Sequence, residues 1–330
     1  RGIGITASGY NTTVNMKGGH IRKNQSATID GYTTTNTSGY GAGIVCENAA
    51  SLVMTGGEIS ENISSSGGTG VLIGTDSSFV MEKGKIAKNT TLPSRDGFQR
   101  YIYGGGVYIQ GAESSFTMGK ENGDNADCII SENSLYRGPS SFSNSIYGGG
   151  IAVSSNAKTF TMYAGTVEKN FVDAGYRIYG YGGGLYVDMA CSIQGGVVQE
   201  NKIAEDSYGY ASGGGIYLRQ EAGGSRIVKN VSILNNESGS RGGGIYINGG
   251  TVYIKNCNIK NNISKSNQGG GIYVSSICYA ETTAISRNQG GGIYVSGHFY
   301  GRGVQITDNK ITGDGGGVYV GSNGIFQITD

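Results

Sequence analysis

The stretch GGGIYVSSICYAETTAISRNQGGGIYV, residues 269–295, contains one complete repeat of this chain. Three glycines lead into Ile272, Tyr273 and Val274, and the unit ends at Asn288 before the glycines return. Successive side chains of a strand point to opposite faces, so such a short strand has one small apolar side. A single unit cannot bury that side, whereas stacked copies form a continuous core.

Both motifs of this unit recur along the chain, and their copies alternate one-to-one. Ten copies of the glycine motif occupy residues 41–45, 68–73, 104–109, 148–153, 182–187, 213–218, 242–247, 269–274, 290–295 and 315–320. Ten copies of Ile/Val-x-x-Asn end at Asn24, Asn62, Asn89, Asn133, Asn170, Asn201, Asn236, Asn262, Asn288 and Asn309. A pair of apolar residues at alternate positions, such as Phe160 and Met162, precedes most of these asparagines.

This pattern predicts an all-β, right-handed parallel β-helix solenoid of about ten coils, forming a single domain over residues 1–330. The apolar period is 2 rather than 3.6, which excludes helical repeats. A propeller blade needs about 40 residues, more than these repeats supply. Handedness follows from the right-handed preference of parallel crossovers. We expect the asparagines from Asn62 to Asn309 to form a hydrogen-bonded column at one corner in left-handed geometry, and the glycines to allow close approach at another.

Composition excludes several classes of function. The net charge is +1 without a basic stripe, so we expect no nucleic-acid partner. No apolar run approaches about 18 residues, so we expect no membrane insertion of this segment. The glycine runs precede strands, whereas a phosphate-binding loop opens a helix. We expect no cofactor and no bound metal, because Asp308 and Asp314 near Gly315 match no calcium-loop spacing.

The five cysteines are predicted to be free and buried. Their number is odd and no CxxC motif is present, which argues against a disulfide framework and a zinc site. Cys191 and Cys278 fall at the same position of coils three apart, and Cys128 and Cys257 at the same position of coils four apart. At ~4.8 Å per coil the first separation is roughly 14 Å, beyond the reach of a disulfide.

Four consecutive insertions of the repeat fall between an asparagine and the next glycine motif, at residues 90–103, 134–147, 171–181 and 202–212. They combine tyrosine and arginine with small polar residues, a composition typical of recognition surfaces. The residues predicted to bind are Arg95, Arg100, Tyr101, Tyr136, Arg137, Asp173, Tyr176, Arg177, Glu205, Asp206 and Tyr208. In the alternative interpretation, the insertions fold onto the solenoid and their tyrosines merely pack.

A line of outward tyrosines is a second candidate surface. These tyrosines follow the glycine motif at Tyr186, Tyr217, Tyr246, Tyr273, Tyr294 and Tyr319. A flat aromatic line can accept sugar rings or a partner protein, and it can also simply stack and stiffen the sheet.

The GGG-Ile-Tyr-Val and Ile-x-x-Asn motifs together resemble the repeats of the chlamydial polymorphic membrane proteins, which carry Gly-Gly-Ala-Ile and Phe-x-x-Asn on a parallel β-helix. They are also similar to repeats in large adhesin-like surface proteins of gut bacteria and archaea. The resemblance covers residues 14–320, with Ile or Val where the chlamydial motif has Phe. It implies a secreted or surface-anchored protein in adhesion, and it carries over no catalytic residue.

We therefore expect a noncatalytic extracellular binding module of a microbial surface protein, which contacts a glycan or a host or partner protein through its insertions. The ending QITD mimics a coil without its asparagine, so we expect the chain to be a fragment of a larger protein. The first alternative is a polysaccharide hydrolase or lyase, because Asp96, Asp173, Glu205 and Asp206 fall in neighbouring insertions and hydrolysis needs two nearby carboxylates. The second alternative is a passive stalk. His20 and His298 lie about ten coils apart in the repeat and are expected to be separate surface residues.

Overall fold

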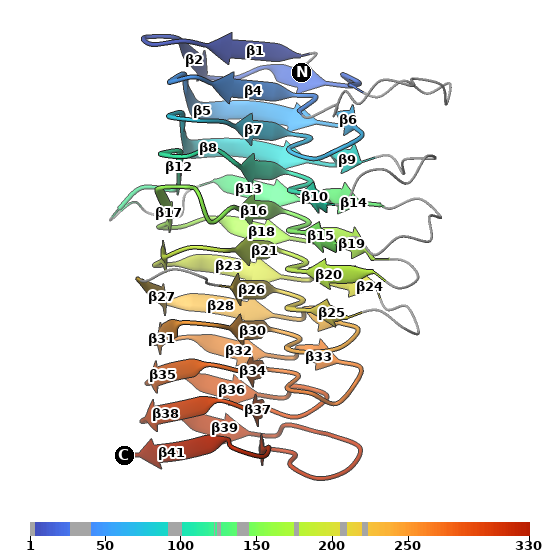
Figure 1. Cartoon of the computed structure of the whole chain (residues 1–330), viewed down its shortest axis with the longest axis vertical. Coiled ribbons are helices and arrows are strands. Elements are labelled where there is room, and N and C mark those ends of the chain that lie inside the picture. Colours follow the sequence, from blue (N-terminus) through green and yellow to red (C-terminus); the bar gives the residue numbers. More distant parts are fainter. Residues whose placement is uncertain are drawn as a thin grey trace.

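The computed structural model describes residues 4–26, 41–91, 101–121, 123, 127–136, 145–174, 178–204, 210–219 and 224–330. These residues form strands that stack coil upon coil into one elongated rod, with the two termini at opposite ends (Figure 1). Strand pairings in the described residues are parallel, and equivalent residues of neighbouring coils lie side by side, as in the pairing of Leu185 with Ile216 and of Ile216 with Ile245. The predicted all-β parallel solenoid is confirmed.

The strands that follow the glycine motif form an eleven-stranded sheet. Its members in spatial order are β1 (Ile5–Ser8), β4 (Ile44–Glu47), β7 (Val71–Ile73), β11 (Val107–Ile109), β16 (Ile151–Val153), β21 (Leu185–Val187), β26 (Ile216–Arg219), β30 (Ile245–Asn248), β34 (Ile272–Val274), β37 (Ile293–Val295) and β40 (Val318–Val320). Strand β1 belongs to a coil outside the ten copies of the motif, because Ile3 stands between Gly2 and Gly4, where the motif has its middle glycine. A Cβ at Gly4 would lie 2.3 Å from the carbonyl oxygen of Gly43 in the next coil.

A second sheet wraps around the core in two columns of strands. The first column holds β2 (Thr13–Met16), β12 (Ser115–Met118), β17 (Thr159–Met162), β22 (Cys191–Ile193), β27 (Ser225–Lys229), β31 (Thr251–Lys255), β35 (Ile277–Glu281), β38 (His298–Arg302) and β41 (Ile325–Thr329). The second holds β3 (His20–Arg22), β13 (Cys128–Ser131), β18 (Thr166–Glu168), β23 (Gly196–Gln199), β28 (Val231–Leu234), β32 (Asn258–Lys260), β36 (Ala284–Ser286) and β39 (Gln305–Thr307). Strands β5 (Ser51–Ser60) and β8 (Ser78–Ala87) run through both columns.

Two smaller sheets follow the asparagine corner. One contains β6 (Ile63–Ser64), β9 (Thr90–Thr91), β14 (Ser134–Leu135), β19 (Phe171–Asp173), β24 (Lys202–Ala204), β29 (Glu237–Ser238) and β33 (Ile263–Ser264). The other contains β10 (Tyr101–Tyr103), β15 (Ser145–Tyr147), β20 (Tyr179–Tyr181) and β25 (Ala211–Ser212). The four strands of this last sheet are the final residues of the four predicted insertions.

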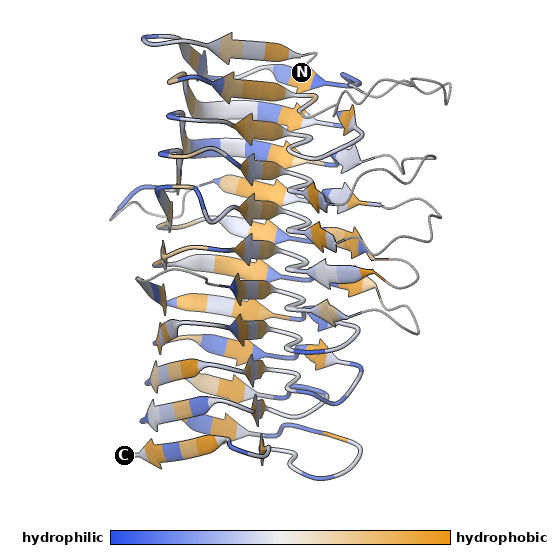
Figure 2. Cartoon of the chain, viewed as in Figure 1, coloured by the Kyte–Doolittle hydropathy of each residue, from blue (hydrophilic) through white to orange (hydrophobic). Residues whose placement is uncertain are grey.

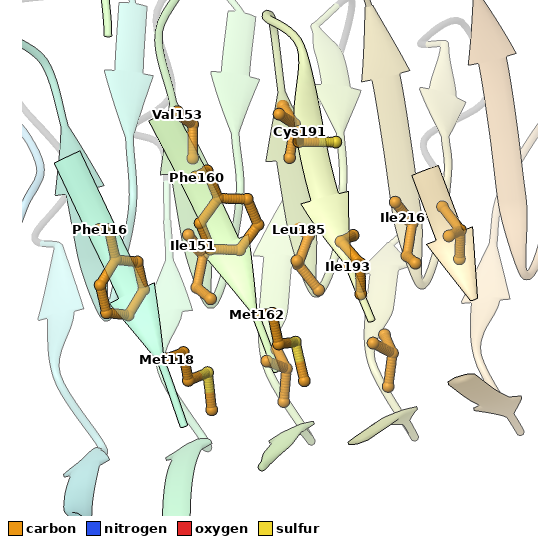
Figure 3. Packing of buried hydrophobic residues seen from close by; sticks show 14 of the residues in the cluster. Phe116, Met118, Ile151, Val153, Phe160, Met162, Leu185, Cys191, Ile193 and Ile216 are labelled. Atoms are coloured by element: carbon orange, nitrogen blue, oxygen red, sulfur yellow. The ribbon is translucent and has the colours of Figure 1, made fainter. Parts of the chain in front are cut away.

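The core consists of columns of like side chains, because each inward position repeats one coil later. Hydrophobic residues recur along every strand layer of the rod (Figure 2). Phe116 stacks between Phe79 and Phe160, with ring centroids 4.7 Å and 5.6 Å apart, and Met118 and Met162 form the neighbouring column (Figure 3). Removing apolar surface from water stabilises by roughly 25 cal/mol per Å², so the continuous core holds each coil against its neighbours.

The asparagines lie in one file at the corner between the second column and the β6–β33 sheet. The Nδ2 of Asn170 donates to the Oδ1 of Asn201 at 2.9 Å, and the Nδ2 of Asn201 donates to the Oδ1 of Asn236 at 3.0 Å. The same bond links each neighbouring pair of Asn24, Asn62, Asn89, Asn133, Asn170, Asn201, Asn236, Asn262, Asn288 and Asn309. Within this column, the asparagines from Asn62 to Asn288 are fully buried.

The expected left-handed geometry falls on the residue before each asparagine, not on the asparagine itself. Lys169 has φ 54° and Glu200 has φ 54°, whereas the column asparagines are not among the residues with positive φ. From Lys23 to Glu200 this preceding position alternates between lysine and glutamate, and ion pairs join Lys23 to Glu61 at 3.6 Å and Lys169 to Glu200 at 3.9 Å. These pairs are about half exposed, so they favour correct coil order while adding little to stability.

One coil departs from the apolar pattern at Arg226, which takes an inward position between Cys191 and Val252. Its side chain is fully buried. The guanidinium donates to the carbonyl oxygens of Met189 at 3.0 Å and of Gly249 at 2.8 Å. Burial lowers the pKa of Arg226. The charge is therefore tolerated because it satisfies carbonyls at the turns of the two neighbouring coils.

All five cysteines are free and buried, as predicted. The strand register places Cys191 and Cys278 at one position three coils apart, through Arg226 and Val252. Burial raises the pKa of Cys46 and of Cys191 to about 12, and that of Cys128 to about 11.

We expect the five thiols to be inert toward a thiolate-specific reagent in the native protein at pH 8. The thiolate is the reactive form, and the raised pKa values keep the thiols protonated throughout the range up to about pH 10. Titration with Ellman's reagent should give close to zero reactive thiols in buffer and five in guanidinium chloride. Rapid reaction of any thiol in buffer would contradict the buried positions.

Candidate binding surface

Two stacked sheets at the ends of the insertions carry their own small core. Strands β9, β14, β19 and β24 are the first residues of the four insertions, and strands β10, β15, β20 and β25 are their last residues. Between the two sheets, Leu135, Ile146, Val172 and Ile203 are buried in one cluster separate from the main core. The described ends of the insertions are therefore held in paired strands over this cluster.

Exposed tyrosines gather on these strands and beside them. Tyr101 is 50% exposed, Tyr179 37% and Tyr210 47%. The rings of Tyr179 and Tyr210 are parallel, with centroids 5.3 Å apart, and the Tyr101 ring lies 6.3 Å from that of Tyr147. We call Tyr101, Tyr179 and Tyr210 the insertion-base tyrosines. They form an amphipathic surface of the kind found at binding hot spots.

Three of the predicted binding residues belong to the described part of the chain. Tyr101 begins β10, and Asp173 ends β19 in a half-buried position. Tyr136 directly follows β14, where its backbone N–H donates to the Oγ1 of Thr91 at 3.0 Å and its ring lies 5.7 Å from that of Phe171. Eight others lie outside the described residues: Arg95, Arg100, Arg137, Tyr176, Arg177, Glu205, Asp206 and Tyr208.

The strands at the ends of the insertions were missed in the sequence analysis, which treated residues 90–103, 134–147, 171–181 and 202–212 as loops. Their signal was the alternation in Tyr-Ile-Tyr at 101–103 and Tyr-Gly-Tyr at 179–181. The alternation places Ile102 in the small core, while Tyr101 is exposed and Tyr103 stacks on Tyr108 and Tyr147. In part, therefore, these tyrosines pack, as the alternative interpretation proposed.

The line of tyrosines after the glycine motif is present but is not an open platform. Rings stack from Tyr186 to Tyr319, with centroids 4.8 to 5.6 Å apart. Tyr186 and Tyr217 are only 2% exposed. They pack against Tyr181, so the sugar-binding interpretation of this line is wrong for the middle coils.

A polar column satisfies the hydroxyls of this buried line. The Tyr186 hydroxyl donates to Asp188 Oδ2 at 3.2 Å, and Asn248 Nδ2 donates to the Tyr217 hydroxyl at 2.6 Å. Arg219 forms an ion pair with Asp188 at 3.3 Å. Burial raises the pKa of Tyr186 and Tyr217. Tyr186 and Tyr217 therefore stay neutral, and the stacked line stiffens the sheet.

The described residues contain no group of three or more His, Cys, Asp and Glu side chains arranged to hold a metal ion. Within the described ranges, no helix has the length and apolar character needed to span a membrane. Asp173 is the one carboxylate of the hydrolase alternative that the described residues include, since Asp96, Glu205 and Asp206 lie outside them. His20 is exposed and His298 is partly exposed; they lie on β3 and β38, near opposite ends of the second sheet.

Comparison with known proteins agrees with this architecture. The family model described as "Right handed beta helix region" matches residues 175–330. Searches of curated proteins and of solved structures found no match. The fold of this chain is thus the right-handed parallel β-helix, and its residues 175–330 carry the sequence signature of that family.

Proposed function

We propose that this chain is a noncatalytic binding module of a microbial surface protein, exposed outside the cell, which contacts a glycan or a partner protein through the side that carries the insertions. The observation that supports this proposal most strongly is the group of insertion-base tyrosines. They are exposed, whereas most tyrosines of the neighbouring buried line are covered.

Rigidity strengthens the proposal. Tyr101 and Tyr179 sit on paired strands above a separate apolar core, and the Arg241 guanidinium lies 5.5 Å from the ring centroid of Tyr210. Ordering these rings costs little further entropy on binding, because the strands already fix them. Arginine over an aromatic ring adds a charged group to the same surface.

A glycan array followed by reducing-sugar assays on every bound glycan tests this function. We expect binding without release of reducing ends. Replacement of both Tyr179 and Tyr210 by alanine should weaken binding at least about tenfold, which corresponds to ~1.4 kcal/mol. Tyr10→Ala is the matched control, since Tyr10 is 83% exposed on the first coil, far from the insertions.

Two outcomes would overturn the proposal. Cleavage of a bound glycan that Asp173→Asn abolishes would establish the hydrolase or lyase alternative. Equal binding by the double tyrosine variant and the Tyr10→Ala control would remove the insertion side as the contact surface. A protein ligand is tested in the same way, by surface plasmon resonance with the same three variants.

A further inference from the structure

A second exposed aromatic column lies away from the insertions, on β31, β35 and β38. Tyr253, Tyr279 and Tyr300 occupy the middle outward position of these strands and pair directly with one another. Tyr253 and Tyr279 are each 42% exposed. They line a surface groove of about 590 Å³, which we call the tyrosine groove.

The groove is local to the last part of the rod. Going back along the same column, Ile227 precedes Tyr253, Ser192 precedes Ile227 and Thr161 precedes Ser192. Gln327 follows Tyr300. The repeat does not require aromatic residues at this position, since the preceding coils have small or aliphatic residues there. The strands of the groove lie along the side of the rod opposite to β20, β25 and β33 (Figure 1).

The other wall of the groove is charged. Lys229, Lys255, Glu281 and Arg302 occupy one outward position of four successive coils. Lys255 pairs with Glu281 at 2.8 Å, which neutralises one charge of each sign. Three positive charges and one negative charge leave this wall with a net charge of +2, centred on Lys229 and Arg302. The groove therefore favours a ligand with negative charges at two separated points.

The rings expose their edges and not their faces. Ring centroids are 5.4 Å apart between Tyr253 and Tyr279 and 5.2 Å apart between Tyr279 and Tyr300, with interplanar angles of 14° and 19°. Each face of the central ring is thus covered by a neighbouring ring. A sugar that stacks needs an open aromatic face, whereas side chains and backbone amides of a peptide can use ring edges and hydroxyls. This geometry favours a polypeptide over a glycan.

We propose that the tyrosine groove binds an extended acidic segment of a partner protein, separately from the insertion side. Lys229 and Arg302 are three coils apart, which is roughly 14 Å at ~4.8 Å per coil. In an extended peptide, residues i and i+4 lie on one side about 13 Å apart. The segment therefore carries acidic residues at i and i+4 and an uncharged residue at i+2, which faces the Lys255–Glu281 pair.

Fluorescence anisotropy with synthetic hexapeptides tests this inference. The probe is fluorescein-labelled Glu-Val-Thr-Val-Glu-Val, and its comparisons are the same peptide with Gln or with Lys at both Glu positions. We expect saturable binding of the acidic peptide to the 330-residue chain, at least tenfold weaker binding of the Gln peptide, and weakening by added salt. Lys229→Glu combined with Arg302→Glu should reduce binding of the acidic peptide at least tenfold.

The matched control combines Lys17→Glu with Arg22→Glu, the same change of charge on exposed residues of the first coils. Thermal melting of both double variants checks that the rod is intact. The inference fails if the acidic peptide does not bind at millimolar concentration, or if both double variants bind it equally. Binding of an oligogalacturonate without binding of the acidic peptide would identify the groove as a glycan site and would also contradict the inference. None of these outcomes depends on the insertion-base tyrosines.

Discussion

Replacement of Asn201 by alanine is expected to lower the free energy of unfolding by about 3–5 kcal/mol, because the change leaves several buried polar groups without partners. The Oδ1 of Asn201 accepts from the backbone N–H of Asn170 at 3.1 Å and from its Nδ2 at 2.9 Å. The Nδ2 of Asn201 donates to the Val167 carbonyl oxygen at 2.9 Å and to Asn236 Oδ1 at 3.0 Å. Alanine offers none of these four bonds, and water has no access to a fully buried site.

The measurement is urea denaturation followed by circular dichroism, with Asn258→Ala as the control. Asn258 lies on β32 with its side chain exposed, so its loss should change stability by no more than about 0.5 kcal/mol. In a solenoid each coil contacts only its neighbours. Because Asn201 lies in the middle of the column, its replacement breaks the hydrogen bonds to the coils on both sides. Equal denaturation midpoints for the two variants would show that the column is not a source of stability.

The stacked architecture and the asparagine column were accessible from sequence because both depend on strictly repeated positions. A side chain such as Asn170 or Phe160 recurs at one place in each coil, and stacking turns this recurrence into a column. Left-handed geometry was misplaced because Asn is the usual residue for it. Here the residue before each column asparagine adopts it, whether that residue is charged, as Lys169 and Glu200 are, or is itself an asparagine, as Asn235 and Asn261 are.

The candidate surfaces were less accessible because they depend on contacts between elements. No local signal shows that Tyr181 covers Tyr186 and Tyr217, since residues 179–181 were taken for the end of a loop. The tyrosine groove had a readable signal, Val-Tyr-Ile, Cys-Tyr-Ala and Phe-Tyr-Gly in three successive coils. It became meaningful only once the strand register aligned the three rings and placed the charged column beside them.

Replacement of Gly182 by alanine should destabilise the rod by about 2–5 kcal/mol, from about 1–2 kcal/mol of left-handed strain and about 1–3 kcal/mol of overpacking. Gly182 has φ 70°, and an added Cβ would lie 2.2 Å from the Leu185 carbonyl oxygen and 2.5 Å from its carbon. These are backbone atoms of the same tight turn, so no side chain can move aside to make room.

The corresponding control is Gly18→Ala, where an added Cβ meets no atom within 4 Å and φ is not in the left-handed region. Thermal melting should show a clear fall in Tm for Gly182→Ala, and no fall in Tm for Gly18→Ala, since alanine reduces the entropy of the unfolded chain.

The second and third glycines of the motif are constrained by the next coil: a Cβ at Gly183 would lie 2.4 Å from the Gly214 carbonyl oxygen of that coil. Gly183→Ala should therefore also lower Tm, through separation of two coils and without left-handed strain. If Gly182→Ala and Gly183→Ala both had the same Tm as the unchanged protein, the coils could not be packed at this spacing.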